Sequence, residues 1–285
     1  MASKNPAPRR PTAAVLVKRA FGDGAIKDKV AAMSMLQQIA ISDRATFRQV
    51  VATLRDQEQP AALRKAALRT LETATFDPAA FAPYRSAYLT ALRALRTDQD
   101  TGLREDAIGI LARERDGDTQ ALLVQGLETP DDALLPAAQA LQMLSYDMHS
   151  GAYDVARRIA AKPPSHAVRR EALRVLAADP KSAAMFEKIL RDKQEDNPIR
   201  QLAACALQQL APQRLHTCAR DIAVSTGEDD QMKTLGMTVL AHFASDETIA
   251  GDSKLKSHVD SLSRQSGGKA SLMTLAAKKL AERYT

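Results

Sequence analysis

The chain has 285 residues, of which 45% are hydrophobic, so it is long enough for one large or two ordinary domains and too apolar to be disordered throughout. Its net charge is +6, but Lys4, Arg9, Arg10, Lys18 and Arg19 lie in the first 20 residues with no acid, which leaves 35 basic and 34 acidic residues elsewhere. Because a nucleic-acid binder usually has a basic body, this balance disfavours that class.

The N-terminal segment is predicted to be a tail. Residues 1–20 are basic, and Pro6, Pro8 and Pro11 oppose an amphipathic helix over most of them, so we expect a disordered stretch whose contact with nucleic acid is weak at most. The run TAAVLV is shorter than a secretory signal, and no stretch approaches the roughly 18 apolar residues of a membrane span. The sequence therefore predicts a cytoplasmic protein without membrane contact. A mitochondrial transit peptide is the alternative.

Beyond the tail, one helical pattern returns at nearly regular intervals. Its frame is apolar, Arg, two free positions, Ala, apolar, two free positions and Leu, as in LRKAALRTL from Leu63 and VRREALRVL from Val168. The copies are 31 to 40 residues apart, a period typical of solenoid repeats. The first positions of the eight copies are Asp28, Leu63, Leu103, Pro136, Val168, Ile199, Met232 and Leu272.

A second amphipathic stretch precedes most copies of the frame. These stretches are residues 43–56, 81–96, 118–128, 153–161 and 181–192. Turns rich in Asp, Gly and Pro separate them from the frame helices, and no segment alternates as a strand does. We therefore expect an all-α chain of helix–turn–helix units without a β-sheet. The small residue of the frame, at Ala67, Ala107, Ala172 and Ala203, should be buried where helices cross closely.

The pattern resembles HEAT repeats, most clearly in EDNPIRQLAACALQQL at residues 195–210. The resemblance implies a right-handed alpha-solenoid of about seven or eight HEAT-like repeats across residues 21–285. It also implies a ladder in which the Arg of each frame pairs with an acid between helices. The cations would be Arg64, Arg104, Arg169, Arg200 and Lys233, and the candidate acids are Asp56, Asp98, Asp196 and Asp230.

The sequence contains no pattern that predicts catalysis, so we assign no catalytic residue, cofactor or metal. The five histidines are scattered, and two cysteines are too few for a disulfide scaffold. Cys205 lies among Ala and Leu and is expected to be a buried free thiol. With His216 and Cys218 it offers three soft metal ligands, but no fourth is evident.

Positions 2 and 6 of the frame lie four residues apart and off the apolar stripe, so they should line the concave face of a solenoid. Two basic pairs occur there, Lys65 with Arg69 and Arg170 with Arg174, and Gln142 and Tyr146 lie between them in the sequence. We therefore predict a protein–protein interaction scaffold or adaptor that binds an acidic partner segment on this face.

Three alternatives stay open at this point. The basic pairs could be ordinary solvated surface. The chain could be an accessory enzyme of the HEAT-like lyase or chaperone type, although no bilin-binding motif is recognisable. It could also bind nucleic acid, but the HEAT-like alkylpurine DNA glycosylases use tryptophans, and this chain has no Trp.

Overall fold

The computed structural model describes residues 11–146, 151–245, 249, 251–264 and 271–283. Over these residues the chain is helical and contains no strand, as the sequence predicts. Among them, no helix has the length and apolar character needed to cross a membrane. The chain divides into two compact units, one of residues 1–123 with 132–135 and the other of residues 124–131 with 136–285. Each unit is described by itself below.

The first unit is built from short helices around one apolar core. They are α1 (Ala13–Phe21), α2 (Ile26–Met33), α3 (Gln37–Ser42), α4 (Arg44–Arg55), α5 (Ala61–Ala74), α6 (Pro78–Phe81), α7 (Arg85–Ala94) and α8 (Thr101–Arg113), with 3-10 turns at Ala82–Tyr84 and Leu95–Thr97. The helix α9 (Gly117–Glu128) and a 3-10 turn at Pro130–Asp132 contain the boundary between the units. The core includes an aromatic cluster in which Phe81 packs edge-on against both Phe47 and Tyr88.

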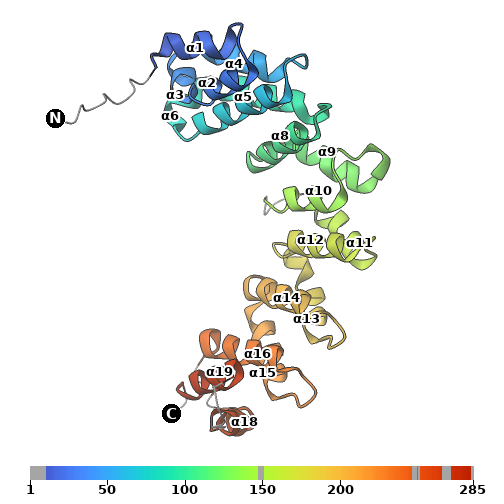
Figure 1. Ribbon diagram of the computed structural model, residues 1–285. Coiled ribbons are helices and arrows are strands. Elements are labelled where there is room, and N and C mark those ends of the chain that lie inside the picture. Colours follow the sequence, from blue (N-terminus) through green and yellow to red (C-terminus); the bar gives the residue numbers. More distant parts are fainter. Residues whose placement is uncertain (1–10, 147–150, 246–248, 250, 265–270, 284–285) are drawn as a thin grey trace, which may run out of the picture. The chain divides into compact units, whose positions relative to one another are not determined.

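The second unit consists of helices that pack in chain order. They are α10 (Ala137–Leu144), α11 (Tyr153–Ala161), α12 (His166–Leu176), α13 (Ala183–Arg191), α14 (Asn197–Leu210), α15 (Pro212–Val224), α16 (Asp230–Phe243), α18 (Ser253–Ser263) and α19 (Leu272–Ala281), with a 3-10 turn at Pro180–Ser182. Figure 1 shows α11 beside α12, α13 beside α14 and α15 beside α16. We call the first member of each such pair a first helix and the member that carries the frame a second helix.

The later small and apolar positions of the repeat frame lie in the core as predicted, but its first position is exposed at Asp28 and Pro136 and only half-buried at Val168. Leu63, Leu103 and Met232 are at most 1% exposed, and the four frame alanines are completely buried. Gly236 takes the place of the frame alanine in α16, and a Cβ atom there would lie only 2.7 Å from the carbonyl oxygen of Ala219 in α15. The small residue is therefore what allows the two helices of a pair to come close.

Two features of the chain ends differ from the sequence interpretation. Residues 13–20 belong to helix α1 rather than to a disordered tail, because Pro11 and Thr12 precede the helix, and Leu16 and Ala20, one turn apart, pack against α2. Residues 1–10 lie outside the described part of the chain. At the other end Leu272 starts α19 with 76% of its surface exposed, so it is not a core anchor.

Candidate protein-binding surface

The basic pair Lys65 and Arg69 lies on α5 in the first unit, and the two side chains differ in their surroundings. The Nζ of Lys65 is 3.0 Å from a carboxylate oxygen of Asp100, the residue that caps α8. Arg69 is exposed and has no ion-pair partner among the described residues. Both members of the Lys65–Asp100 pair retain solvent access, so the pair is weak and a partner carboxylate could replace Asp100 at little cost.

The second basic pair surrounds a buried acid that sequence reasoning did not assign. Arg174 Nη1 lies 2.8 Å and 2.9 Å from the two carboxylate oxygens of Glu171, and Arg170 Nε lies 3.4 Å from one of them. The Glu171 side chain is only 8% exposed, whereas both arginines are about half exposed. The cluster therefore carries one net positive charge, and Arg174 also stabilises a buried carboxylate.

Gln142 and Tyr146 lie at the C-terminal part of α10, in the same unit as Arg170 and Arg174. Gln142 is exposed, and Tyr146 follows the helix with 45% of its surface exposed. The helices α10 and α12 pack against each other, so Gln142, Arg170 and Arg174 lie on neighbouring second helices, with Tyr146 just beyond the end of α10. Lys65 and Arg69 belong to the first unit, so the predicted set is distributed over both units.

Position 6 of the frame faces solvent in both units, and we call these residues, within each unit taken by itself, the second-helix row. Its members are exposed at every copy except Gly109, namely at Ser34, Arg69, Gln142, Arg174, Cys205, Thr238 and Lys278. The predicted buried thiol is therefore wrong for Cys205, which faces solvent, while Cys218 in α15 is buried. Position 2 is less regular: Thr274 is buried at the start of α19, although Ala276, Ala277 and Leu280 keep the buried positions of the frame there.

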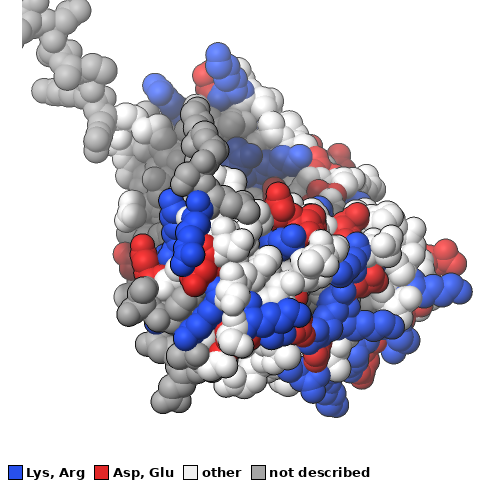
Figure 2. Space-filling view, turned by 90° about the horizontal axis from the view of Figure 1, so that it is seen from below, with Lys and Arg blue, Asp and Glu red and all other residues white. Residues whose placement is uncertain are grey.

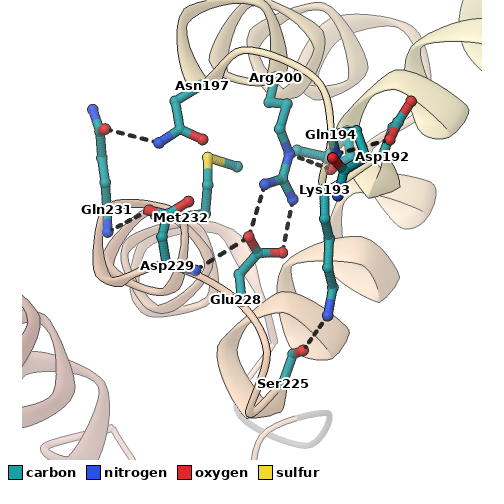
Figure 3. Close-up of polar contacts among 11 residues, drawn as sticks. Asp192, Lys193, Gln194, Asn197, Arg200, Ser225, Glu228, Asp229, Gln231 and Met232 are labelled. Atoms are coloured by element: carbon teal, nitrogen blue, oxygen red, sulfur yellow. Dashed lines mark hydrogen bonds and ion pairs between the residues drawn. The ribbon is translucent and has the colours of Figure 1, made fainter.

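The frame arginines form ladder contacts of the kind that the resemblance implies. Arg64 and Arg200 are buried and form equivalent hydrogen bonds. Each Nε donates to a backbone carbonyl ten residues upstream, at Leu54 and at Leu190, and the two terminal nitrogens of each guanidinium donate to the two oxygens of one carboxylate. For Arg64 this acid is Asp98, and for Arg200 it is Glu228, at 2.7 Å and 2.8 Å (Figure 3).

These bonds set the protonation of the acids. Burial raises the pKa of the Asp98 carboxyl, but the bonds from Arg64 and from the backbone N–H of Asp100 outweigh it and leave the pKa below the ordinary value. The bonds from Arg200 lower the pKa of Glu228 against the effect of burial. Both pairs are therefore ionised near neutral pH, and their arginines are committed to packing.

The sequence identified the cations of the ladder better than the acids. Arg169 pairs with Glu195 at 2.8 Å rather than with Asp196, and Arg200 pairs with Glu228 rather than with Asp230. Arg104 and Lys233 pair with no acid among the described residues, and Arg104 donates instead to the backbone carbonyl of Asp98 at 2.7 Å. The acid that is used lies just before the next second helix, and the length of that loop decides which residue reaches the guanidinium.

A second set of ion pairs, absent from the sequence interpretation, connects the first helices. Arg93 of α7, Arg157 of α11 and Arg220 of α15 each bind the aspartate that caps the following first-helix segment, at Asp116, Asp179 and Asp252. Each aspartate also accepts backbone N–H bonds, and its pKa is lowered despite burial. An Arg in the middle or at the end of a first helix, followed 22 to 32 residues later by a capping Asp, is the signal that could have found them.

The described residues offer little for catalysis. No group of three or more His, Cys, Asp or Glu side chains among them could hold a metal ion. Burial raises the pKa of the Cys218 thiol to about 11, which makes it a poor nucleophile. On the face seen in Figure 2, Lys and Arg side chains alternate with Asp and Glu instead of forming one basic stripe.

Comparisons with known proteins give distant likenesses only. No protein-family profile matches the chain, and no curated protein matches it. Among solved structures, human deoxyhypusine hydroxylase in complex with glycerol is 13% identical with a TM-score of 0.36, over 88% of this chain and 98% of that one. The complex of CpcE and CpcF of phycocyanin lyase from Nostoc sp. PCC7120 is 15% identical with a TM-score of 0.27, over the whole of both chains. Likenesses at this level carry no argument about the activity of this chain.

Proposed function

We propose that this chain is a helical-repeat scaffold that binds a protein partner along the second-helix row. The observation that carries the proposal is the regular exposure of frame position 6, whose neighbours in the frame are packed. In the second unit, α10, α12, α14, α16 and α19 follow one another in packing contact, so their exposed side chains form a continuous row. Repeat arrays commonly bind extended partners on such rows.

The chemistry of the row, and of Lys65 and Arg170 at frame position 2 beside it, favours a partner segment with scattered rather than dense acidic residues. Arg69 has no competing acid among the described residues, and Lys65 is held only by an exposed pair with Asp100. Arg170 and Arg174 share the charge of Glu171. In the second unit Gln142, Cys205 and Thr238 of the row, with Tyr146 beside it, add hydrogen-bonding and apolar surface rather than charge, so each unit presents a mildly basic surface.

Charge reversal at α5 tests this proposal. The Lys65→Glu/Arg69→Glu variant should capture the native partner more slowly and with a weaker salt dependence, because charges at a rim act mainly on the association rate. Lys181→Glu/Lys188→Glu is the matched control, since it makes the same charge change at exposed lysines outside the row that have no ion-pair partner among the described residues. Equal association of the wild type and the α5 variant, at equal melting temperature, would refute the role of these two residues.

A further inference from the structure

A groove lies between α4 and α7, two consecutive first helices of the first unit. It is therefore on first-helix surface, whereas the second-helix row is on second helices. It is a shallow, open depression of about 460 Å³, lined by the apolar residues Phe47, Val51, Ala52 and Ala87 and by the charged residues Arg48, Arg55 and Asp56. The apolar base of the groove is well packed, because Phe47 is 3% exposed and its ring contacts that of Tyr84, with ring centroids 4.4 Å apart.

Arginines project with helical spacing from the side of α4 that borders this groove, and two of them, Arg48 and Arg55, line it. Arg44, Arg48 and Arg55 recur at intervals of one and two turns, so they project from the same side of α4. All three are exposed, and in the described part of the chain none has an ion-pair partner. The acids at the two ends of α4 are occupied: Asp43 caps the helix through Ala45 and Thr46, and Asp56 bonds Glu58 N–H and the Gln59 side chain.

The facing helix offers these arginines nothing to bind. The exposed residues Ala87, Thr90 and Ala94 recur along α7 and are small and uncharged. Between α13 and α15 in the second unit the equivalent surface is closed by ion pairs, Arg191 with Asp221 at 2.8 Å and Arg214 with Glu187 at 2.9 Å. The α4–α7 groove therefore has arginines that could form such ion pairs, but it has no acidic partners for them among the described residues.

From this charge pattern we propose that the α4–α7 groove binds an amphipathic helix of a partner protein whose apolar stripe is flanked by acidic residues. The apolar side chains of that helix would cover Val51, Ala52 and Ala87, above the buried ring of Phe47, and its carboxylates would pair with Arg48 and Arg55. Helix-in-groove binding of this kind uses apolar anchors at intervals of three and four residues. The site is separate from the second-helix row and does not depend on it.

Defined peptides test the proposal on the full-length protein by fluorescence anisotropy. The probes are a panel of labelled 18-residue helical peptides, each with Leu at helical spacing and Glu on both flanks of the stripe, and a second panel with Gln in place of Glu. We expect saturable binding of the Glu peptides that weakens with salt, and at least tenfold weaker binding of the Gln peptides. Arg48→Glu/Arg55→Glu should reduce affinity for the Glu peptides at least tenfold, since it removes two attractions and adds two repulsions.

Two further variants separate the groove from general electrostatics. Ala87→Glu places a charge on the exposed floor and should weaken binding similarly, whereas Lys181→Glu/Lys188→Glu changes the total charge as much as the Arg48/Arg55 reversal and should leave affinity unchanged. The proposal is overturned if no Glu peptide binds, if the Gln peptides bind equally well, or if the control variant loses as much affinity as the Arg48/Arg55 variant. It is also overturned if a single-stranded RNA oligonucleotide, and no peptide, binds in an Arg48-dependent manner.

Discussion

Arg200 shows most clearly what a single residue does in this molecule. Its side chain is 1% exposed and contacts two elements at once, the end of α13 through Leu190 and the loop before α16 through Glu228. A buried ion pair adds little over a well-packed apolar pair, but loss of one partner leaves a buried charge uncompensated. Arg200 therefore fixes the position of the α13–α14 pair against the α15–α16 pair more than it increases the stability of the protein.

The Arg200→Met variant tests this role. It should lower the free energy of unfolding by about 3–5 kcal/mol, because Glu228 is then buried without its partner. The Arg200→Met/Glu228→Leu variant should recover much of this loss, since it removes both charges. Urea unfolding followed by circular dichroism measures both variants. A single variant as stable as wild type, or a double variant no better than the single one, would show that the pair is not desolvated.

The two cysteines should differ in reactivity because their surroundings differ. Cys205 is exposed on α14, whereas Cys218 is buried with its pKa raised to about 11. A maleimide reagent should therefore label Cys205 quickly in the native protein and Cys218 only after unfolding. Mass spectrometry of the labelled peptides reports the sites. Rapid native labelling of Cys218 would contradict the packing of α15.

At the scale of helices, the small residue of the frame determines how closely the first and second helices of a pair pack. Gly236 illustrates this, because a Cβ atom there would also lie 3.2 Å from the backbone nitrogen of Ala223. The obstacles are backbone atoms, which cannot move aside as a flexible side chain would. Ordinary helix propensity, which favours Ala over Gly by about 1 kcal/mol, is thus expected to be outweighed.

The Gly236→Ala variant should therefore be destabilised by about 1–3 kcal/mol, the usual cost of overpacking. Gly117→Ala, where the added Cβ meets nothing within 4 Å, is the control and should be neutral or slightly stabilising. Thermal melts of the two variants decide the sign. A Gly236→Ala protein that melts above wild type would mean that α15 and α16 do not cross closely.

The helices could be predicted from the sequence because their signals are local. The stretches 153–161 and 118–128 became α11 and α9 almost residue for residue, and Ala172 and Ala203 are completely buried. The ion pairs are not local: Arg200 reaches an acid 28 residues away, and the intervening loop decides that this acid is Glu228 and not Asp230. For the same reason, the sequence pattern could not predict that Asp100, at the start of α8, forms an ion pair with Lys65 of α5.

At the scale of the whole molecule, the acids of both sets of ion pairs should make stability depend on acid pH. Asp98, Glu195, Glu228 and Asp252 have pKa values below their ordinary values of 3.8 for Asp and 4.5 for Glu. Because the folded pKa lies below the unfolded one, the stabilisation is complete above the ordinary values and is lost as the pH falls through the folded values. The urea midpoint should change little between about pH 7 and pH 5 and fall steeply below about pH 4.5.

The Arg200→Met/Glu228→Leu variant serves as the control for this pH dependence. It lacks one of the depressed carboxyl groups, so its urea midpoint should fall less steeply in the acid range than that of the wild type. A wild-type midpoint that stays constant down to about pH 3 would contradict the pairing of these acids.

Site-specific photo-cross-linking in the second unit tests the central claim, partner binding along the second-helix row, most directly. A photoreactive residue would replace Gln142, Cys205 or Thr238 in the row, or Lys188 or Thr217 on exposed positions of first helices. After irradiation with a lysate of the source cells, the account predicts one common partner adduct from the three row positions and none from Lys188 or Thr217. Adducts from the first-helix positions alone, or equally from both sets, would contradict it.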